Sequence, residues 1–360
     1  MAERPACIVI GSNCFTGSHI VDALLEEGEY SVIGVSRSPE AKSLYLPYKQ
    51  RQSAGFRFCQ IDLVREFARL SELIKEVRPP VVINVAALSE VALSNERPLE
   101  YFETNTLGVV RLVDFLRPCR FLHRYVHISS AEIYGPCERA VAEDAHIYPS
   151  TPYAVSKAAA DLYLKTLSDQ TGFPAILIRS TNVYGKHQQL YKIIPRTVIY
   201  LKQGKRIELH GGGLAVKSFI HIRDVVAGVL AALRVGAPET YHFSVPSPQT
   251  VADVVREVCL LMGRDFAQAT CSVGERIGQD SRYWLDSTKA QRELGWSARV
   301  AFTEGLKEVI DWVEENWDEI KSEPLNYVHK EPARKKRPDK KEWATRSSDL
   351  LPFSEAIAGQ

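Results

Sequence analysis

Tyr153 and Lys157 are the residues of this sequence best placed for proton transfer. They are four positions apart in Tyr153-Ala-Val-Ser-Lys157, at the start of a predicted helix, so both side chains project from one helical face. A nearby ammonium group favours the phenolate form and lowers the pKa of a tyrosine, which makes the tyrosine a better general base. The pair therefore predicts a proton-transfer site. Because Y-x-x-x-K is a common pattern, its meaning depends on the residues around it.

Ser130 and Glu132 supply a hydroxyl and a carboxylate that belong with this pair. Both lie in Ile128-Ser-Ser-Ala-Glu-Ile-Tyr-Gly135, directly after a predicted strand. A second segment, Asn84-Val-Ala-Ala-Leu-Ser89, ends the preceding strand, and Asn105 lies in the next helix. The carboxyl ends of parallel strands meet at one edge of a sheet, so we expect these groups to surround the tyrosine and the lysine.

A glycine-containing turn predicts a dinucleotide site at the same edge. In Ile8-Val-Ile-Gly-Ser-Asn-Cys-Phe-Thr-Gly17 a predicted strand passes into a helix, where free backbone N–H groups favour a pyrophosphate. Gly11 permits the tight turn and Gly17 the close approach of helix to sheet. Cys14 stands where such loops usually have a middle glycine, and we expect its Cβ to crowd the phosphates.

The end of the second predicted strand indicates which dinucleotide binds. It reads Val35-Ser-Arg-Ser38, with an arginine and hydroxyls instead of an acidic residue, which favours the 2′-phosphate of NADP, with NAD as the alternative. The lysine of the Y-x-x-x-K pair is expected to bond the nicotinamide ribose. The expected cofactor contacts are Gly11, Asn13, Cys14, Phe15, Thr16, Gly17, Ser36, Arg37, Asp62, Leu63, Ala86, Ala87, Ser89, Asn105, Tyr153 and Lys157.

The elements that must position these residues alternate between short β-rich runs and helices. This pattern predicts an α/β fold with a doubly wound parallel sheet, the Rossmann arrangement, over residues 1–185. Shorter elements separated by proline and glycine predict a smaller C-terminal α/β lobe over 186–320, which shares a cleft with the first part. Residues 321–360 read as a basic, mobile tail. The predicted strands are 6–11, 31–35, 56–61, 81–85, 125–128 and 175–179.

Composition excludes several classes of protein. The formal net charge is +1, which gives no basic surface for nucleic acid or for an acidic membrane, so neither partner is expected. No apolar run is long enough for a membrane span, and the N-terminus lacks the features of a signal peptide. Seven scattered cysteines predict neither disulfides nor a metal site, and favour the reducing cytoplasm.

Taken together, residues 6–320 resemble the extended short-chain dehydrogenase/reductase family, in particular the dTDP-glucose and GDP-mannose 4,6-dehydratases and the related epimerases. The resemblance implies that Ser130, Tyr153 and Lys157 move a proton and a hydride at sugar C4. It also implies a homodimer built on a four-helix bundle, with Ala158, Ala159, Leu162 and Leu164 as a possible contact face. The implied substrate contacts are Ser89, Ser130, Ala131, Glu132, Asn182, Lys192, Lys217 and Arg276.

Glu132 and Ala131 decide which reaction the resemblance implies. Many 4,6-dehydratases have Thr-Asp-Glu here, in which the Asp protonates the departing 6-hydroxyl and the Glu removes the C5 proton. This sequence has Ser-Ala-Glu, so the acid is missing while the base remains. The leading interpretation is a nucleotide-sugar 4,6-dehydratase that makes an NDP-4-keto-6-deoxyhexose. The alternatives are a nucleotide-sugar 4-epimerase, a UDP-glucuronate-type decarboxylase, and a catalytically silent nucleotide-binding scaffold.

The histidines are expected to contribute less. His127 and His221 lie in apolar strands and read as core residues, whereas His187, in the loop after Gly185, is the histidine expected to contact substrate.

Overall fold

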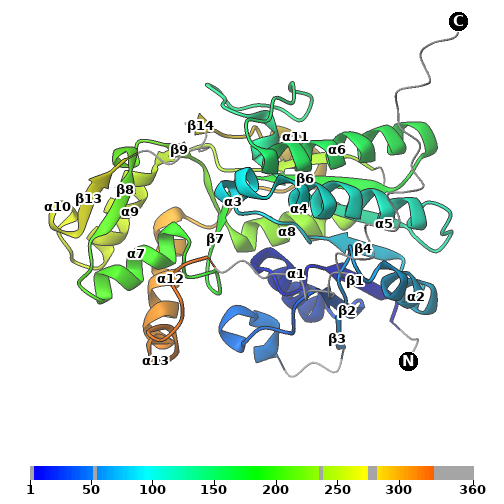
Figure 1. The fold of residues 1–360 in the computed structure, drawn as a ribbon, viewed down its shortest axis with the longest axis horizontal. Helices are drawn as coiled ribbons and strands as arrows, with labels where there is room; N and C mark the ends of the chain where they lie inside the picture. The colour runs from blue at the N-terminus through cyan, green and yellow to red at the C-terminus, as the bar shows by residue number, and fades with distance from the viewer. Residues whose placement is uncertain (1–3, 52–54, 235–237, 275–281, 328–360) are drawn as a thin grey trace, which may run out of the picture. The chain divides into compact units, whose positions relative to one another are not determined.

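Seven parallel strands form the central sheet of the structure, a computed structural model that describes residues 4–51, 55–234, 238–274 and 282–327 (Figure 1). The strand order is β11-β6-β5-β4-β1-β2-β3. From β1, the strands β2 and β3 extend the sheet toward one edge, and β4, β5 and β6 extend it toward the other. The strand order therefore reverses between β1 and β4, where such sheets bind ligands. The strands are β1 Ala6–Ile10, β2 Ser31–Ser36, β3 Phe56–Gln60, β4 Val81–Asn84, β5 Arg124–Ile128, β6 Ala175–Ser180 and β11 Thr240–Phe243.

Helices cover both faces of this sheet because its strands are apolar on both sides. In β1, Cys7 and Val9 pack toward one group of helices, and Ile8 and Ile10 toward the other. The first group is α1 Phe15–Glu27, α8 Ile222–Leu233 and α11 Thr288–Leu294. The second is α2 Phe67–Val77, α5 Gly108–Leu116 and α6 Pro152–Thr171. This arrangement confirms the predicted doubly wound α/β fold.

Short segments connect the strands and helices at the functional edge of the sheet. They include a π-helical turn, labelled η3, that carries Asn105. These segments are η1 Ser43–Tyr45, η2 Pro47–Gln50, α3 Val91–Glu96, α4 Pro98–Phe102, η3 Glu103–Leu107 and η4 Ala131–Tyr134.

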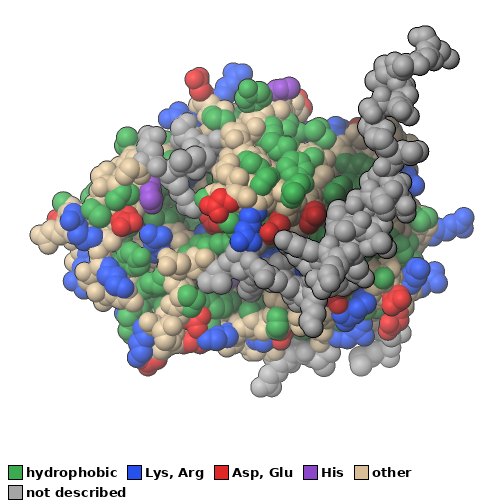
Figure 2. Space-filling view, viewed as in Figure 1, with side chains coloured by type: hydrophobic (Ala, Val, Ile, Leu, Met, Phe, Trp, Pro, Cys, Tyr) green, Lys and Arg blue, Asp and Glu red, His purple; other side chains and the backbone are tan. Residues whose placement is uncertain are grey.

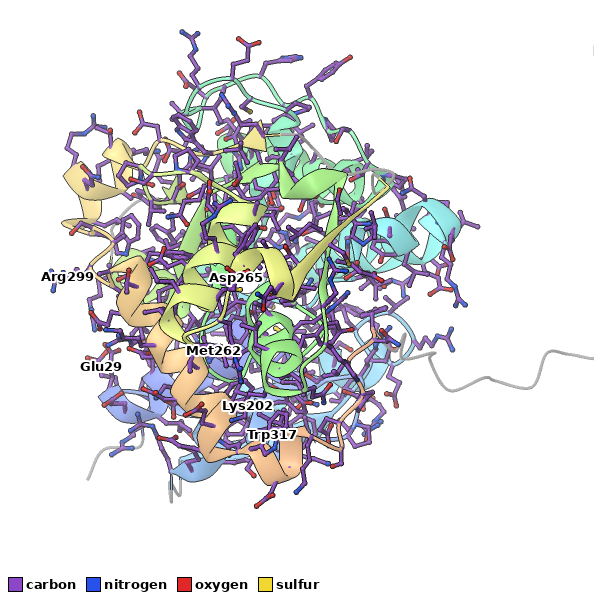
Figure 3. All side chains as sticks on the ribbon, turned by 90° about the vertical axis from the view of Figure 1, so that its left-hand side faces the viewer. Glu29, Lys202, Met262, Asp265, Arg299 and Trp317 are labelled. Carbon is purple, nitrogen blue, oxygen red and sulfur yellow. The ribbon has the colours of Figure 1, made fainter. Side chains whose placement is uncertain are left out.

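The smaller group of elements has its own apolar core and lies at the left of Figure 1. In Figure 3, Lys202, Met262 and Trp317 mark the ends of α7, α9 and α13, and the Lys202 Nζ lies 5.1 Å from the centre of the Trp317 ring. The helices are α7 Ile193–Lys202, η5 Gly211–Gly213, α9 Val251–Leu261, α10 Phe266–Ala269, α12 Phe302–Glu315 and α13 Trp317–Ile320. The strands are β7 Asn182–Tyr184, β8 Ile207–His210, β9 Val216–Lys217, β10 Phe219–His221, β12 Gln249–Thr250, β13 Thr270–Val273 and β14 Arg282–Tyr283.

The boundary between the two predicted parts is less simple than one cut after residue 185. After forming α7 and β8–β10, the chain returns to the central sheet, where β11 pairs with β6 and α8 packs beside α1. It then leaves again for α9, α10 and α12. Residues 328–360, which hold most of the predicted basic tail, lie outside the described residues. Among the described helices, none is both long enough and apolar enough to span a membrane.

Candidate active site

A cleft of about 300 Å³ lies at the carboxyl ends of the central strands, where the predicted site residues come together. Its walls come from the loops after β1, β4, β5 and β6, from the start of α6, and from the smaller group of elements. Of the predicted residues, those that line it are Cys14, Phe15, Thr16, Ala87, Ser89, Ser130, Glu132, Tyr153, Lys157, Asn182 and Lys192. Further lining residues that the sequence did not single out are Thr181, Gln188, Gln189 and Tyr283.

The turn between β1 and α1 has the shape that a dinucleotide needs. Gly11 has φ +95°, and a Cβ there would lie 2.7 Å from the Ala86 nitrogen. A Cβ on Gly17 would lie 2.2 Å from the Gly11 oxygen, so both positions require glycine. The first turn of α1 begins beside the cleft, which Phe15 and Thr16 line, and the first N–H groups of a helix have no partner within the helix and favour an anion. The residues present therefore fit the pyrophosphate of a dinucleotide.

Cys14 caps α1 in addition to lining the cleft. Its Sγ accepts a hydrogen bond from the Gly17 N–H at 3.2 Å, the role usually taken by a serine or aspartate oxygen. Burial raises the pKa of this thiol to about 11, so the group is neutral near pH 7. The side chain that was expected only to crowd the phosphates also stabilises the turn that binds them.

At the end of β2, two of the predicted residues join the loops to each other. The Ser36 hydroxyl accepts a hydrogen bond from the Asn13 N–H at 3.0 Å, and the Asn13 amide donates to the carbonyls of Ser38 and Pro39 at 3.1 and 2.8 Å. Arg37 is partly exposed, and its guanidinium forms no ion pair with another described residue. It therefore remains the group at this strand end that could meet a phosphate.

Three other predicted cofactor contacts have structural roles and do not line the cleft. The Asp62 carboxylate accepts from the N–H groups of Val64 and Arg65 at 2.8 and 3.0 Å, and Leu63 is buried in the core. Asn105 is fully buried, and its side-chain amide forms hydrogen bonds with neighbouring residues.

Asn105 fixes the loop after β4 to the catalytic helix. Its Oδ1 accepts from the Leu88 N–H at 2.8 Å, and its Nδ2 donates to the Leu88 carbonyl and to the Ser156 hydroxyl, both at 3.0 Å. Ser156 lies in α6 between the two residues of the proton-transfer pair. Asn105 is thus a positioning residue for both walls of the cleft.

Tyr153 lies in the first turn of α6, where Thr151 caps the helix by accepting from the Ala154 N–H. Ser130 caps η4 and hydrogen-bonds the Tyr153 phenol, and Glu132 follows it on the same turn. Burial raises the pKa of Tyr153 well above its ordinary value, and the Glu132 charge adds to this effect, while the hydrogen bond from Ser130 opposes it. The arrangement brings together hydroxyl, carboxylate and phenol as predicted.

Lys157 does not act on Tyr153 in the way the sequence suggested. Its ammonium donates to the Ile128 carbonyl at 2.7 Å and lies 3.3 Å from the His127 Nε2, so it turns toward β5. The predicted lowering of the pKa of Tyr153 by Lys157 is therefore absent. Burial lowers the pKa of Lys157 to about 8, and the Asp161 carboxylate opposes this decrease.

A buried polar network lies behind Lys157, and sequence reasoning missed it. Asp161, one turn further along α6, pairs with Arg179 of β6 at 2.9 Å, and both are almost fully buried. Arg179 also donates to the Tyr134 hydroxyl, which lies 2.7 Å from the His242 Nε2. The i, i+4 spacing of Lys157 and Asp161 on α6 was the signal in the sequence for this network.

The predicted substrate residues Asn182, Lys192 and Lys217 belong to the smaller group of elements, and their side chains differ in exposure. Asn182 accepts from the Tyr283 hydroxyl at 2.8 Å, and Lys192, also in the cleft, pairs with Glu90 at 3.6 Å. Lys217 is buried with its Nζ 4.1 Å from the centre of the Tyr283 ring, so it lies behind the cleft wall.

Three further predicted residues do not line this cleft or fall outside the described residues. Ala131 is buried in an apolar cluster with Ala158 and Leu285 and does not line the cleft. His187 hydrogen-bonds the Leu44 carbonyl at 2.8 Å and lines a different cavity from the one that holds the other predicted site residues. Arg276 lies outside the described residues.

Comparison with known proteins places this fold and site in a family. Residues 7–244 match the model of the NAD dependent epimerase/dehydratase family. Because the match covers more than half of the chain, the protein belongs to this family, which confirms the predicted resemblance.

Several relatives are similar over nearly the full described length. The dTDP-D-glucose 4,6-dehydratase of Homo sapiens is 29% identical over 324 residues, which cover 88% of this chain and 91% of that protein. The dTDP-glucose 4,6-dehydratase of Haemophilus influenzae is 26% identical over 331 residues, covering 85% and 96%. Among solved structures, DesIV, the dTDP-glucose 4,6-dehydratase of Streptomyces venezuelae with NAD and TYD bound, has a TM-score of 0.80 at 28% identity, covering 87% of this chain and 98% of that one.

An epimerase is almost equally similar in fold. The UDP-glucose 4-epimerase of Thermotoga maritima with UDP-glucose has a TM-score of 0.79 at 25% identity, covering 87% of this chain and 99% of that one. The fold therefore does not by itself separate dehydration from epimerisation, and the residues in the cleft must do so.

Proposed function

We propose that this protein is a nucleotide-sugar 4,6-dehydratase, which converts an NDP-hexose to an NDP-4-keto-6-deoxyhexose with a tightly held nicotinamide cofactor. The observation that carries the proposal is the position of Glu132 on η4, lining the cleft beside Ser130 and Tyr153. A simple 4-epimerase moves a hydride at C4 and has no use for a carboxylate base at this place. The named dehydratase relatives support the same conclusion.

The residues of the cleft divide the chemistry among them. Tyr153, hydrogen-bonded to Ser130, is the proposed base for the sugar 4-hydroxyl, and because burial raises its pKa this role requires the positive charge that an oxidised nicotinamide would supply when bound. The β1–α1 turn and Lys157 would hold a nicotinamide cofactor, which would supply the hydride-transfer chemistry between C4 and C6. A ketone at C4 acidifies the C5–H bond, so the Glu132 carboxylate removes that proton and passes it to the 6-hydroxyl, which leaves as water. A solvent proton is then added at C5 as hydride reaches C6. Lys157 holds the ribose of the cofactor, and Asn105 and Thr151 hold the helix and loop that carry these groups.

Ala131 leaves the departing hydroxyl without the carboxylic acid that many dehydratases place there. In this fold the position is buried against Ala158 and Leu285, so an aspartate introduced there would be desolvated. We infer that water departs here without a dedicated aspartic acid. Because this acid is missing, 4-epimerisation and UDP-glucuronate-type decarboxylation are the alternative activities of this site.

Product mass tests the proposal directly. When the protein is incubated with a panel of nucleotide sugars, the proposal predicts a product lighter by one water. Loss of carbon dioxide identifies a decarboxylase, and an isomer of unchanged mass identifies an epimerase. If no nucleotide sugar reduces the bound cofactor or changes in mass, the protein is a silent scaffold.

The Glu132→Gln variant tests the role of the base. The amide keeps the size of the side chain but cannot accept the C5 proton, so we expect dehydration to fall by about 10²–10⁴-fold. Oxidation at C4 should continue, because Ser130, Tyr153 and Lys157 are intact. The variant should accumulate reduced cofactor and show no solvent deuterium at C5. Full turnover by this variant would contradict the assignment.

We also propose NADP as the preferred cofactor, with NAD as the alternative. Arg37 and Ser38 at the end of β2 support NADP, whereas the NAD in the DesIV structure supports the alternative. We further propose a cytoplasmic location, because all seven cysteines are free in the structure, as a reducing compartment permits.

We propose, in addition, a homodimer, supported by exposed apolar side chains on neighbouring elements. Leu99 of α4, Leu107 of η3 and Leu162 of α6 are 77%, 58% and 52% exposed. Figure 2 shows hydrophobic side chains gathered over α4 and the start of α6. Ala158 and Leu164, which the sequence placed on the contact face, are instead buried within the protomer. Of the predicted contact residues, Leu162 lies on this exposed face, and Leu99 and Leu107 are further members that were not predicted.

A further inference from the structure

His127 is a fully buried histidine beside the catalytic lysine, and the proposed reaction does not use it. It lies in β5, and its Nε2 is 3.3 Å from the Lys157 Nζ and 3.9 Å from the Asp161 Oδ1. Its Nδ1 has no hydrogen-bond partner among the described residues. Burial and the Lys157 charge lower the pKa of His127 well below its ordinary value, so the ring is neutral and able to accept a hydrogen bond.

The ammonium of Lys157 has three N–H bonds, and two of them have partners in β5. One donates to the Ile128 carbonyl at 2.7 Å, and another to the His127 Nε2. Because the directions of the three bonds are tetrahedral, fixing two determines the third. Lys157 lines the cleft, so the third bond is free to meet a cofactor or substrate oxygen there.

We propose that His127 is a positioning residue for Lys157, which accepts one hydrogen bond from the ammonium and thereby aims another into the cleft. The proposal rests on the proposed function of Lys157 in that cleft. The role requires a neutral acceptor, because a third cation beside Lys157 and Arg179 would leave three positive charges around the one carboxylate that the described residues place among them, that of Asp161. A histidine kept neutral by burial meets this requirement.

The charged and titratable groups around Lys157 come from four elements. Asp161 and Tyr153 belong to α6 with it, and His127 belongs to β5. Arg179 of β6 acts through its pair with Asp161, and Glu132 of η4 acts through Tyr153. Of these groups, His127 is the one that Lys157 contacts directly through a side-chain hydrogen bond. Loss of that acceptor favours the neutral amine, so the pKa of Lys157 should fall further.

The test compares three substitutions that place an acceptor differently. In His127→Gln the amide oxygen reaches the position of Nε2, in His127→Asn it reaches only that of Nδ1, and His127→Leu has no acceptor. The readout is the rate at which a nucleotide sugar reduces the bound cofactor, followed by absorbance across pH. This half-reaction is common to dehydratases, epimerases and decarboxylases, so it does not depend on which product forms.

We expect the glutamine variant to keep the parental rate within about threefold, and the leucine and asparagine variants to lose roughly tenfold or more. In these two impaired variants the alkaline limb of the pH profile should move to lower pH by about one unit, since the lysine loses its proton earlier. If the leucine variant does not fold, the glutamine and asparagine variants still give the comparison. Equal rates and equal alkaline limbs for all variants would overturn the proposal.

A separate outcome identifies failure of the proposed function. If the parent protein reduces no cofactor with any nucleotide sugar, the function is wrong. The proposal for His127 is then judged by the titration of Lys157 itself, measured by ¹³Cε NMR of labelled lysine and assigned with Lys157→Arg. A Lys157 titration that is the same in the parent and in His127→Leu would overturn it.

Discussion

The role of a single residue in this protein depends on the partner to which its polar atoms hydrogen-bond. The sequence predicts that Cys14 crowds the phosphates, and the structure shows in addition that its sulfur caps α1. His127 was read as a core residue, but it contacts the catalytic lysine. Neither role could be predicted, because one sequence does not show which distant residue a buried side chain will contact. Tyr153, Lys157, Ser130 and Glu132 were found because spacing along one helix and position after one strand specify their place.

The proposed preference for NADP rests on Arg37 at the end of β2. The Arg37→Ala change should weaken NADP binding by about tenfold to a hundredfold, because the charge-assisted hydrogen bonds to a 2′-phosphate are lost. NAD binding should change little, since NAD has no phosphate there. Titration of both cofactors into cofactor-stripped parent and variant provides the measurement. Tighter binding of NAD by the parent, with no effect of the substitution, would reject NADP as the preferred cofactor.

At the scale of elements, the first half of the fold follows from the sequence and much of the second half does not. The predicted strands at 31–35, 125–128 and 175–179 match β2, β5 and β6 within one residue at each end. By contrast, β9, β12 and β14 have two residues each, which is too short for any periodic pattern. The return of α8 and β11 to the central sheet also depends on pairing with β6, a contact between segments about sixty residues apart.

Asn105 shows how one side chain connects several elements. The Asn105→Ala change removes three hydrogen bonds and leaves the buried Leu88 N–H and carbonyl without these partners. The Ser156 hydroxyl keeps its bond to the Tyr153 carbonyl. We expect the free energy of unfolding to fall by about 3 kcal/mol. The matched control is Thr106→Val, which removes one hydrogen bond to the Ser156 carbonyl and should cost about 1 kcal/mol. Equal losses in denaturant titrations of the two variants would contradict this role.

At the scale of the whole molecule, the exposed face of α4, η3 and α6 predicts association. The double change Leu107→Glu and Leu162→Glu puts charge on this face and should convert a dimer to the 40.4 kDa chain. The control is Leu260→Glu on α9, since that side chain is 76% exposed but lies on another element. Sedimentation of the parent, the double variant and the control at micromolar concentration distinguishes a dimer from the single chain. A parent that sediments only as the single chain would reject the dimer.

Buried histidines predict how stability depends on pH. Burial lowers the pKa of His221 and that of His242 to about 3, so both stay neutral in the folded state while the unfolded chain takes up protons near pH 6.5. Between those values the unfolded state binds more protons, and stability falls as pH decreases, by up to about 1.4 kcal/mol per pH unit for each histidine.

The measurement is the melting temperature from pH 7 to pH 5. His221→Asn keeps an acceptor for the Arg223 N–H that His221 caps, and it should show a shallower decline than the parent. An identical decline in both proteins would assign the acid sensitivity to other groups.

The charge balance behind the active site also indicates how an inert form of the protein could be made. Lys157 and Arg179 share the single buried carboxylate of Asp161. Replacing Asp161 with asparagine would leave two cations without a counter-charge, whereas Lys157→Met leaves a neutral Asp161–Arg179 pair and a side chain of similar length. The methionine variant should therefore fold well while losing turnover. Such a variant would hold an unreacted sugar nucleotide in the cleft long enough for its base and its sugar to be identified by crystallography.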